Sequence, residues 1–232
     1  AALKGLKPKG FAAAAATLLE AELGRPAPES VAAGLIELLG SLRDEAGIDV
    51  LVKALRTSTD KSIRFRAVKS LGEIGTPPAA APLIAELDRP AAEQEKDVVA
   101  EAVTALAQVG GDAARARLEK ALGEFIDHDN PNPKARENAA RGLARAGTLA
   151  SVDPLLKCAK SDPDAAVRKE AWAAALALSD AAAARLDALQ ALLGKIGDAE
   201  ADATWRIVVR GILVKPGNFE AARAKGHLKL LA

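Results

Sequence analysis

The chain has 232 residues, of which half are hydrophobic, yet aromatic residues make up only 3% and neither Met nor Tyr occurs. Lys and Arg number 32 against 31 Asp and Glu, so the chain lacks the basic excess with which proteins grip nucleic acid, and strong nucleic-acid binding is not expected. No apolar run reaches the length of about 18 residues that a membrane-spanning helix needs.

The first predicted element is an apolar helix that starts at residues 11–19 and continues past Glu20. Three lysines precede it, as in a signal peptide, but a good cleavage context is missing and the helical pattern continues. The chain begins Ala1-Ala2 without Met, so we expect a processed form or a part of a longer chain. The compartment stays open between the cytoplasm and, if a signal peptide has been removed, an extracytoplasmic location.

A helix-start motif then recurs along the chain, with an Asp, an apolar residue three positions on, an Arg at the fourth and an Ala three further. Copies of varying quality start at residues 28, 60, 95, 132, 164 and 202, so successive starts lie 32 to 38 residues apart. The first residue and the Arg of the four best copies are Asp60 and Arg64, Asn132 and Arg136, Asp164 and Arg168, and Asp202 and Arg206. A fixed period of this length is typical of stacked helical repeats.

Each copy is predicted to open a helix B that follows a shorter apolar helix A. The first Asp or Asn suits the free N–H groups at a helix start, and we expect the Arg four residues later to pair with it. Apolar residues at 63, 67, 71 and 74 mark one buried helix face, and Gly75 follows as a terminator. Pro82 and Pro154 lie near the starts of two A helices, where a missing N–H costs little.

A helix pair of 30–40 residues with an early Pro in helix A and an Asp-x-x-Val-Arg-x-x-Ala start to helix B resembles a HEAT repeat, in the short bacterial form also found in phycobilin lyases. The resemblance implies an all-α fold, a right-handed α-solenoid (alpha-alpha superhelix) of about six helix hairpins whose B helices line the concave face. We expect a single domain over 1–232, ending in a C-terminal capping helix. Its expected units are 10–44, 45–76, 77–110, 111–147, 148–179 and 180–215, with the cap at 216–232.

Catalytic patterns are absent from the sequence. Neither His128 nor His227 has a patterned Ser or Cys partner, and no phosphate-binding or metalloprotease motif occurs. We therefore expect no enzyme, no cofactor and no metal. Cys158 lies alone in an apolar helix and is interpreted as a small core residue. The acidic loop at 127–129 is interpreted as a turn between helices, although a metal site there stays open.

The exposed face of the B helices is the predicted partner-binding surface. Matching positions of stacked repeats fall in register, and they place one aromatic and four basic side chains on one strip: Phe65, Lys69, Arg141, Arg145 and Lys169. Such a strip suits a protein or an extended peptide, in particular an acidic one, although an ordinary solvated face is the plain alternative. The predicted chain is a monomer or part of a larger chain.

The predicted function is a non-enzymatic scaffold or a protein- or peptide-binding module. The first alternative is a structural spacer within a longer chain. The others are a HEAT-like DNA-alkylation glycosylase, which Trp172 and Trp205 keep open, and a tetrapyrrole-chromophore lyase.

Overall fold

The computed structural model describes residues 10–24, 29–124 and 131–178, and this part of the chain is built from helices without any strand. Ten α-helices follow one another, joined by short connections. Their bounds are α1 Phe11–Leu23, α2 Glu29–Leu42, α3 Ile48–Thr57, α4 Lys61–Ile74, α5 Ala80–Leu87, α6 Lys96–Val109, α7 Gly111–Glu124, α8 Pro133–Ala146, α9 Val152–Ser161 and α10 Ala165–Ala177. Four short 3-10 segments precede helices, at Glu45–Gly47, Pro77–Ala79, Ala91–Glu93 and Leu149–Ser151.

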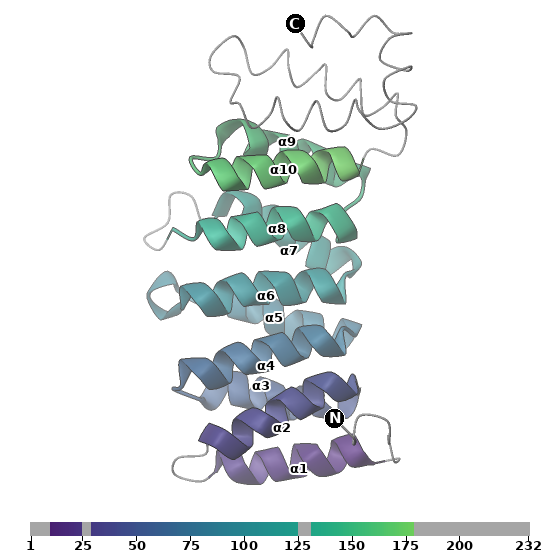
Figure 1. Cartoon of the computed structure of the whole chain (residues 1–232), viewed down its shortest axis with the longest axis vertical. Coiled ribbons are helices and arrows are strands. Elements are labelled where there is room, and N and C mark those ends of the chain that lie inside the picture. Colours follow the sequence, from purple (N-terminus) through teal and green to yellow (C-terminus); the bar gives the residue numbers. More distant parts are fainter. Residues whose placement is uncertain (1–9, 25–28, 125–130, 179–232) are drawn as a thin grey trace, which may run out of the picture.

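The helices lie in two layers (Figure 1). The even-numbered helices α2, α4, α6, α8 and α10 stack side by side, each against the next, and form the B layer. The odd-numbered helices lie behind them as the A layer, and each packs against the even-numbered helix that follows it in the chain. The prediction of an all-α solenoid of helix hairpins is confirmed for the described residues.

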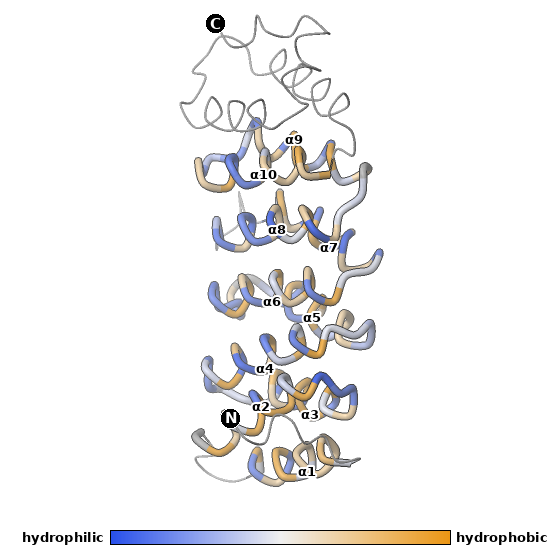
Figure 2. The backbone as a smooth tube through the Cα atoms, turned by 45° about the vertical axis from the view of Figure 1, so that its right-hand side comes forward, coloured by the Kyte–Doolittle hydropathy of each residue, from blue (hydrophilic) through white to orange (hydrophobic). Residues whose placement is uncertain are grey.

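The core between the two layers follows the helical spacing of the sequence. On α4, Ile63, Ala67, Leu71 and Ile74 are all buried, and Leu71 is completely enclosed. Hydrophobic and hydrophilic residues alternate along the B-layer helices in Figure 2, as expected for helices that bury one face. Each large side chain buried in this way contributes about 1.5–3 kcal/mol, and stacking the repeats joins their separate faces into one continuous core.

Small residues allow the B-layer helices to approach closely. A Cβ atom placed on Gly72 of α4 would lie 2.7 Å from the Cβ of Ala105 on α6. One placed on Gly142 of α8 would lie 2.6 Å from the Cβ of Ala107, also on α6. No real Cβ atom tolerates such distances, so α6 requires glycine on both of its neighbours. This packing explains how a sequence rich in alanine and poor in aromatics still builds a dense core.

Three polar side chains cap the starts of B-layer helices. Asp60 accepts a hydrogen bond from the backbone N–H of Ser62 at 2.7 Å, and Asn132 accepts one from Ala135 at 3.0 Å. Asp164 accepts two, from Ala166 at 2.8 Å and Val167 at 3.2 Å. These bonds satisfy N–H groups that the first helical turn leaves free.

The expectation that each repeat Arg pairs with the acid at the start of its own helix is wrong for the described copies. Arg64 donates instead to Glu86 of α5 at 2.5 Å. Arg136 donates to both carboxylate oxygens of Asp162, which follows α9, from Nε at 2.7 Å and from Nη2 at 2.9 Å. The capping oxygens already serve the backbone, and each buried guanidinium reaches toward the next hairpin, so these arginines join successive repeats.

The third repeat arginine behaves differently. Arg168 donates to the backbone carbonyls of Asp162 and Pro163, at 2.9 and 3.0 Å. It therefore braces the turn before its own helix rather than the cap residue Asp164.

Several predictions lie outside the described residues: Asp202, Arg206, the loop at 127–129, the unit 180–215 and the cap 216–232. The single-domain organisation stays a prediction. None of the helices described above is long and apolar enough to cross a membrane. Within the same residues, no three metal-binding side chains lie close enough together to hold an ion.

Candidate functional site

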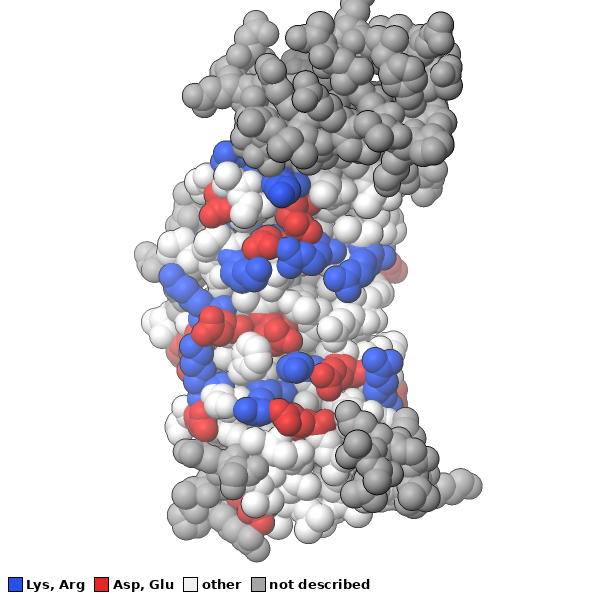
Figure 3. Space-filling view, viewed as in Figure 1, with Lys and Arg blue, Asp and Glu red and all other residues white. Residues whose placement is uncertain are grey.

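The outer face of the B layer carries its charges in rows that follow the helices (Figure 3). α6 presents an acidic row, and its acidic residues are Asp97 and Glu101. The neighbouring α8 presents a mainly basic row, and its basic residues besides the buried Arg136 are Lys134, Arg141 and Arg145. The face as a whole is therefore mixed in charge, with rows of opposite sign on adjacent helices.

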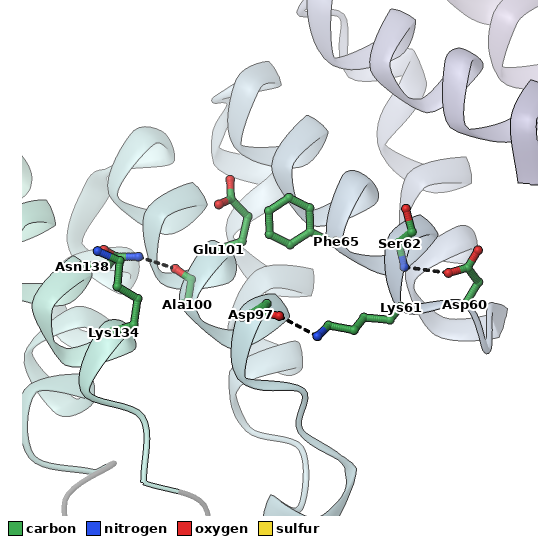
Figure 4. Close-up of a pocket in the computed structure, with 9 residues that line it drawn as sticks. All are labelled: Asp60, Lys61, Ser62, Phe65, Asp97, Ala100, Glu101, Lys134 and Asn138. Atoms are coloured by element: carbon green, nitrogen blue, oxygen red, sulfur yellow. Dashed lines mark hydrogen bonds and ion pairs between the residues drawn. The ribbon is translucent and has the colours of Figure 1, made fainter.

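A hollow of about 760 Å³ opens on this face across the N-terminal halves of α4, α6 and α8 (Figure 4). We call it the Phe65 hollow. Its lining residues are Asp60, Lys61, Ser62, Phe65, Asp97, Ala100, Glu101, Lys134 and Asn138. Three successive hairpins contribute to it, so the hollow exists only when the repeats are stacked.

Phe65 is half-buried and packs its ring against the core while it lines the hollow. Sequence analysis placed this side chain on the exposed face without seeing that the core holds part of it. A ring anchored in this way is already held in place before a partner binds. Aromatic side chains in pockets are common hot spots of protein interfaces.

Glu101 lies beside Phe65 in the hollow and is also half-buried. Its side chain forms no hydrogen bond or ion pair with any residue that the structure describes. Burial raises the pKa of Glu101 above its ordinary value, and the negative charge of Glu73 on α4 adds to this rise while Lys69 opposes it. The hollow thus contains a partly desolvated carboxylate that no residue of the described ranges pairs with.

The other charged groups at the hollow are already paired. Lys61 donates to Asp97 at 2.5 Å and joins α4 to α6, while Lys134 donates to Glu137 at 3.0 Å. Asn138 donates at 3.0 Å to the carbonyl of Ala100, and its amide nitrogen lies equally close to the hydroxyl of Thr104. These contacts hold the side chains around the hollow in place, because each donor bonds to an acceptor on the same or the adjacent helix.

The predicted basic strip is not continuous. Lys69 is exposed on α4, but the acidic row of α6 separates it from the arginines of α8. Arg141 is held between Glu137 at 2.5 Å and Glu170 of α10 at 3.1 Å, and its hydrogen bond to Glu137 raises its pKa. Arg145 and Lys169 are exposed and form no ion pair with a described residue. Of the four basic residues predicted for the strip, only these two have a positive charge that no described acidic residue pairs with.

Neither Asp97 nor Glu101 belongs to the predicted strip, which names no residue of α6. The signal was present, since Asp97 and Glu101 are four residues apart and must lie on one helix face. The burial of Glu101 could not be predicted in this way, because it depends on the neighbouring helix.

Neither Cys158 nor Trp172 offers an accessible reactive group, because both are buried in the core. Burial raises the pKa of the Cys158 thiol to about 12, and the nearby Asp162 carboxylate adds to this effect. Thiolate is the nucleophilic form, so Cys158 has no role as a nucleophile near neutral pH.

We expect the Cys158 thiol to react very slowly with a disulfide reagent at about pH 8 while the chain is folded. With a pKa of about 12, only roughly one thiol in ten thousand is ionised there, and the side chain is enclosed as well. Stopped-flow absorbance should record slow labelling in buffer and fast labelling in concentrated guanidinium. Equal rates under both conditions would contradict the buried position of Cys158.

Comparisons with known proteins identify the architecture. A family described as HEAT repeats matches residues 15–96 and 124–205. A search of curated proteins finds no match. Among solved structures, the chain resembles the complex of CpcE and CpcF of phycocyanin lyase from Nostoc sp. PCC7120, with a TM-score of 0.56, 22% identity and 94% of each chain covered. Human deoxyhypusine hydroxylase in complex with glycerol matches at a TM-score of 0.37 and 19% identity, over 91% of this chain and 86% of that one.

These findings correct the expectation that the chain is not an enzyme, which was wrong. The architecture it shares with the phycocyanin lyase structure over 94% of both chains is one that an enzyme uses. The expectation relied on missing nucleophile and metal motifs, and such motifs cover only part of the chemistry that a protein surface can support.

Proposed function

Because this chain belongs to the HEAT-repeat family, we propose that it binds a protein partner through the outer face of its B layer, centred on the Phe65 hollow. The observation that carries the proposal is the hollow itself, with a half-buried aromatic ring at a junction of three hairpins. Its volume of about 760 Å³ leaves room for several side chains of a partner.

The proposal fits how stable interfaces are built. A few aromatic anchors in pockets supply most of the binding energy, and surrounding charges steer the approach of the partner. Phe65 would be such an anchor, with the rows on α6 and α8 as the charged surroundings. The solved structure that this chain resembles is itself a complex of two proteins, which supports contact with a protein as the mode of action.

The charge rows also restrict the partner. A uniformly acidic segment would meet Asp97 and Glu101 on α6, so it suits only the end of the face where Arg145 and Lys169 are exposed. A partner with both signs of charge, arranged to oppose these rows, suits the whole face.

Phe65→Ala is expected to weaken partner binding about thirtyfold, because truncating an anchor residue costs roughly 2 kcal/mol. The partner is first captured from source-cell extract with the wild-type chain, then purified and titrated by calorimetry. Phe65→Leu, which keeps an apolar group in the hollow, should lose less affinity. Lys157→Ala on the exposed side of α9 is the control on the A layer and should bind as the wild type does.

A double variant tests the wider face. Arg141→Glu/Lys169→Glu reverses charge on α8 and α10, and it should slow association most at low salt, where surface charges are least screened. If Phe65→Ala and this double variant both fold and bind with wild-type affinity, the partner does not use the B-layer face.

A second candidate is a subunit of a lyase that attaches a tetrapyrrole chromophore to a protein. It is favoured by the resemblance to the phycocyanin lyase complex over almost the whole chain. The test mixes the purified chain and its captured partner with apo-phycocyanin and free bilin, and follows covalent attachment by absorbance after denaturation. Attachment that depends on the chain supports this candidate, and none above the control without the chain counts against it.

A further inference from the structure

We infer that the Phe65 hollow receives a cationic side chain of the partner, an arginine or a lysine, between the Glu101 carboxylate and the Phe65 ring. This inference rests on the proposed function and names the chemistry that the hollow recognises. It reverses the expectation of an acidic ligand for this part of the face.

The three acidic residues that line the hollow differ in their contacts. Asp60 caps the start of α4 and Asp97 holds Lys61 at 2.5 Å. Glu101 is the one lining acid with no such contact among the residues that the structure describes. A carboxylate that is half-buried and unpaired carries an uncompensated desolvation cost, and a cation from outside would remove it.

The Phe65 ring lies next to the Glu101 carboxylate in the hollow. Figure 4 shows the Phe65 ring and the Glu101 carboxylate adjacent to each other at the hollow, one from α4 and one from α6. A cation over an aromatic face is attracted by the ring electrons, and a guanidinium can at the same time donate charge-assisted hydrogen bonds to a carboxylate. An aliphatic side chain would contact the ring but leave the carboxylate unpaired, and an acidic side chain would be repelled by the carboxylate. The ring and the carboxylate together therefore select for positive charge.

The basic residues that line the hollow do not pair with Glu101. The two lysines of the hollow are engaged by Asp97 and Glu137, at 2.5 and 3.0 Å. Lys69 influences Glu101 electrostatically from one turn further along α4, but it forms no ion pair with it, and its closest acid is Glu73 at 3.9 Å. The carboxylate of Glu101 therefore stays available to a ligand.

The test uses amide spectra of the isotopically labelled full chain, titrated with acetyl-arginine amide. The expected result is a saturable shift of signals from α4 and α6. The affinity behind it should fall about tenfold or more in Glu101→Gln, because the neutral amide cannot accept a charge-assisted hydrogen bond from the guanidinium as a carboxylate does. Glu170→Gln on α10 removes an acid of the same face away from the hollow and should leave the shifts unchanged. Acetyl-glutamine, acetyl-glutamate and acetyl-leucine amides should not produce them.

Folding is checked on the same variants. Glu101→Gln should melt at the wild-type temperature or above it, because the change removes a partly buried charge that has no partner. Weakened arginine binding together with unchanged or higher stability supports a recognition role over a structural one. Equal arginine binding by wild type and Glu101→Gln, or the same shifts with the neutral or acidic amides, overturns the inference.

The same variants separate the two proposals when the natural partner is titrated. If Phe65→Ala weakens partner binding and Glu101→Gln does not, the proposed face is correct and the cationic side chain is wrong. If neither variant weakens it, both proposals fail.

Discussion

Asp162→Ala should destabilise the folded chain by about 3–5 kcal/mol, the range for removing one partner of a buried ion pair. The Asp162 carboxylate is completely buried, and Arg136 donates to both of its oxygens. Without Asp162, the Arg136 guanidinium stays buried and loses both of these charge-assisted hydrogen bonds. Urea unfolding followed by circular dichroism measures the loss.

A double variant isolates the pair from the other contacts of Asp162, whose carboxylate also accepts from the backbone N–H of Asp164 at 2.8 Å and from the Cys158 thiol at 3.9 Å. Arg136→Leu/Asp162→Leu should be more stable than Asp162→Ala, because it removes the buried guanidinium together with the carboxylate and fills the space with apolar side chains. If the double variant is as unstable as the single one, the carboxylate acts through the turn before α10 and not through Arg136.

Leu71→Ala should cost about 2–5 kcal/mol, the range for truncating a fully buried leucine. Leu71 is completely enclosed on α4, between the helices of its own hairpin and the neighbouring B-layer helices. The same urea titration measures the effect, read as a shift of the midpoint.

Leu18→Ala is the matched control, since it makes the same chemical change on α1 at a side chain that is 59% exposed. We expect it to change stability by about 0.5 kcal/mol or less. Comparable losses for the two substitutions would mean that the register of the buried face is misassigned.

The repeat architecture was readable from the sequence because its determinants are local. The helical spacing of Ile63, Ala67 and Leu71 determines which face of α4 is buried, and an Asp or Asn at a helix start serves N–H groups only a few residues away. Spacing and turn residues along one segment are sufficient for both conclusions.

The partners of the arginines and the hollow were not readable in this way. Glu86 lies 22 residues beyond Arg64, and Asp162 lies 26 beyond Arg136, in helix-end positions that the motif does not mark. The hollow depends on how α6 is rotated between α4 and α8, which is determined by the close approaches at Gly72 and Gly142.

The most direct test of the proposed binding face is hydroxyl-radical footprinting of the chain, alone and saturated with its purified partner. Oxidation of Phe65 should fall on binding, together with that of other residues on the outer side of α4, α6 and α8, while Leu18 on α1 should be oxidised equally in both states. Unchanged oxidation of Phe65, with protection confined to the A-layer helices α3, α5, α7 and α9, would contradict the proposed face.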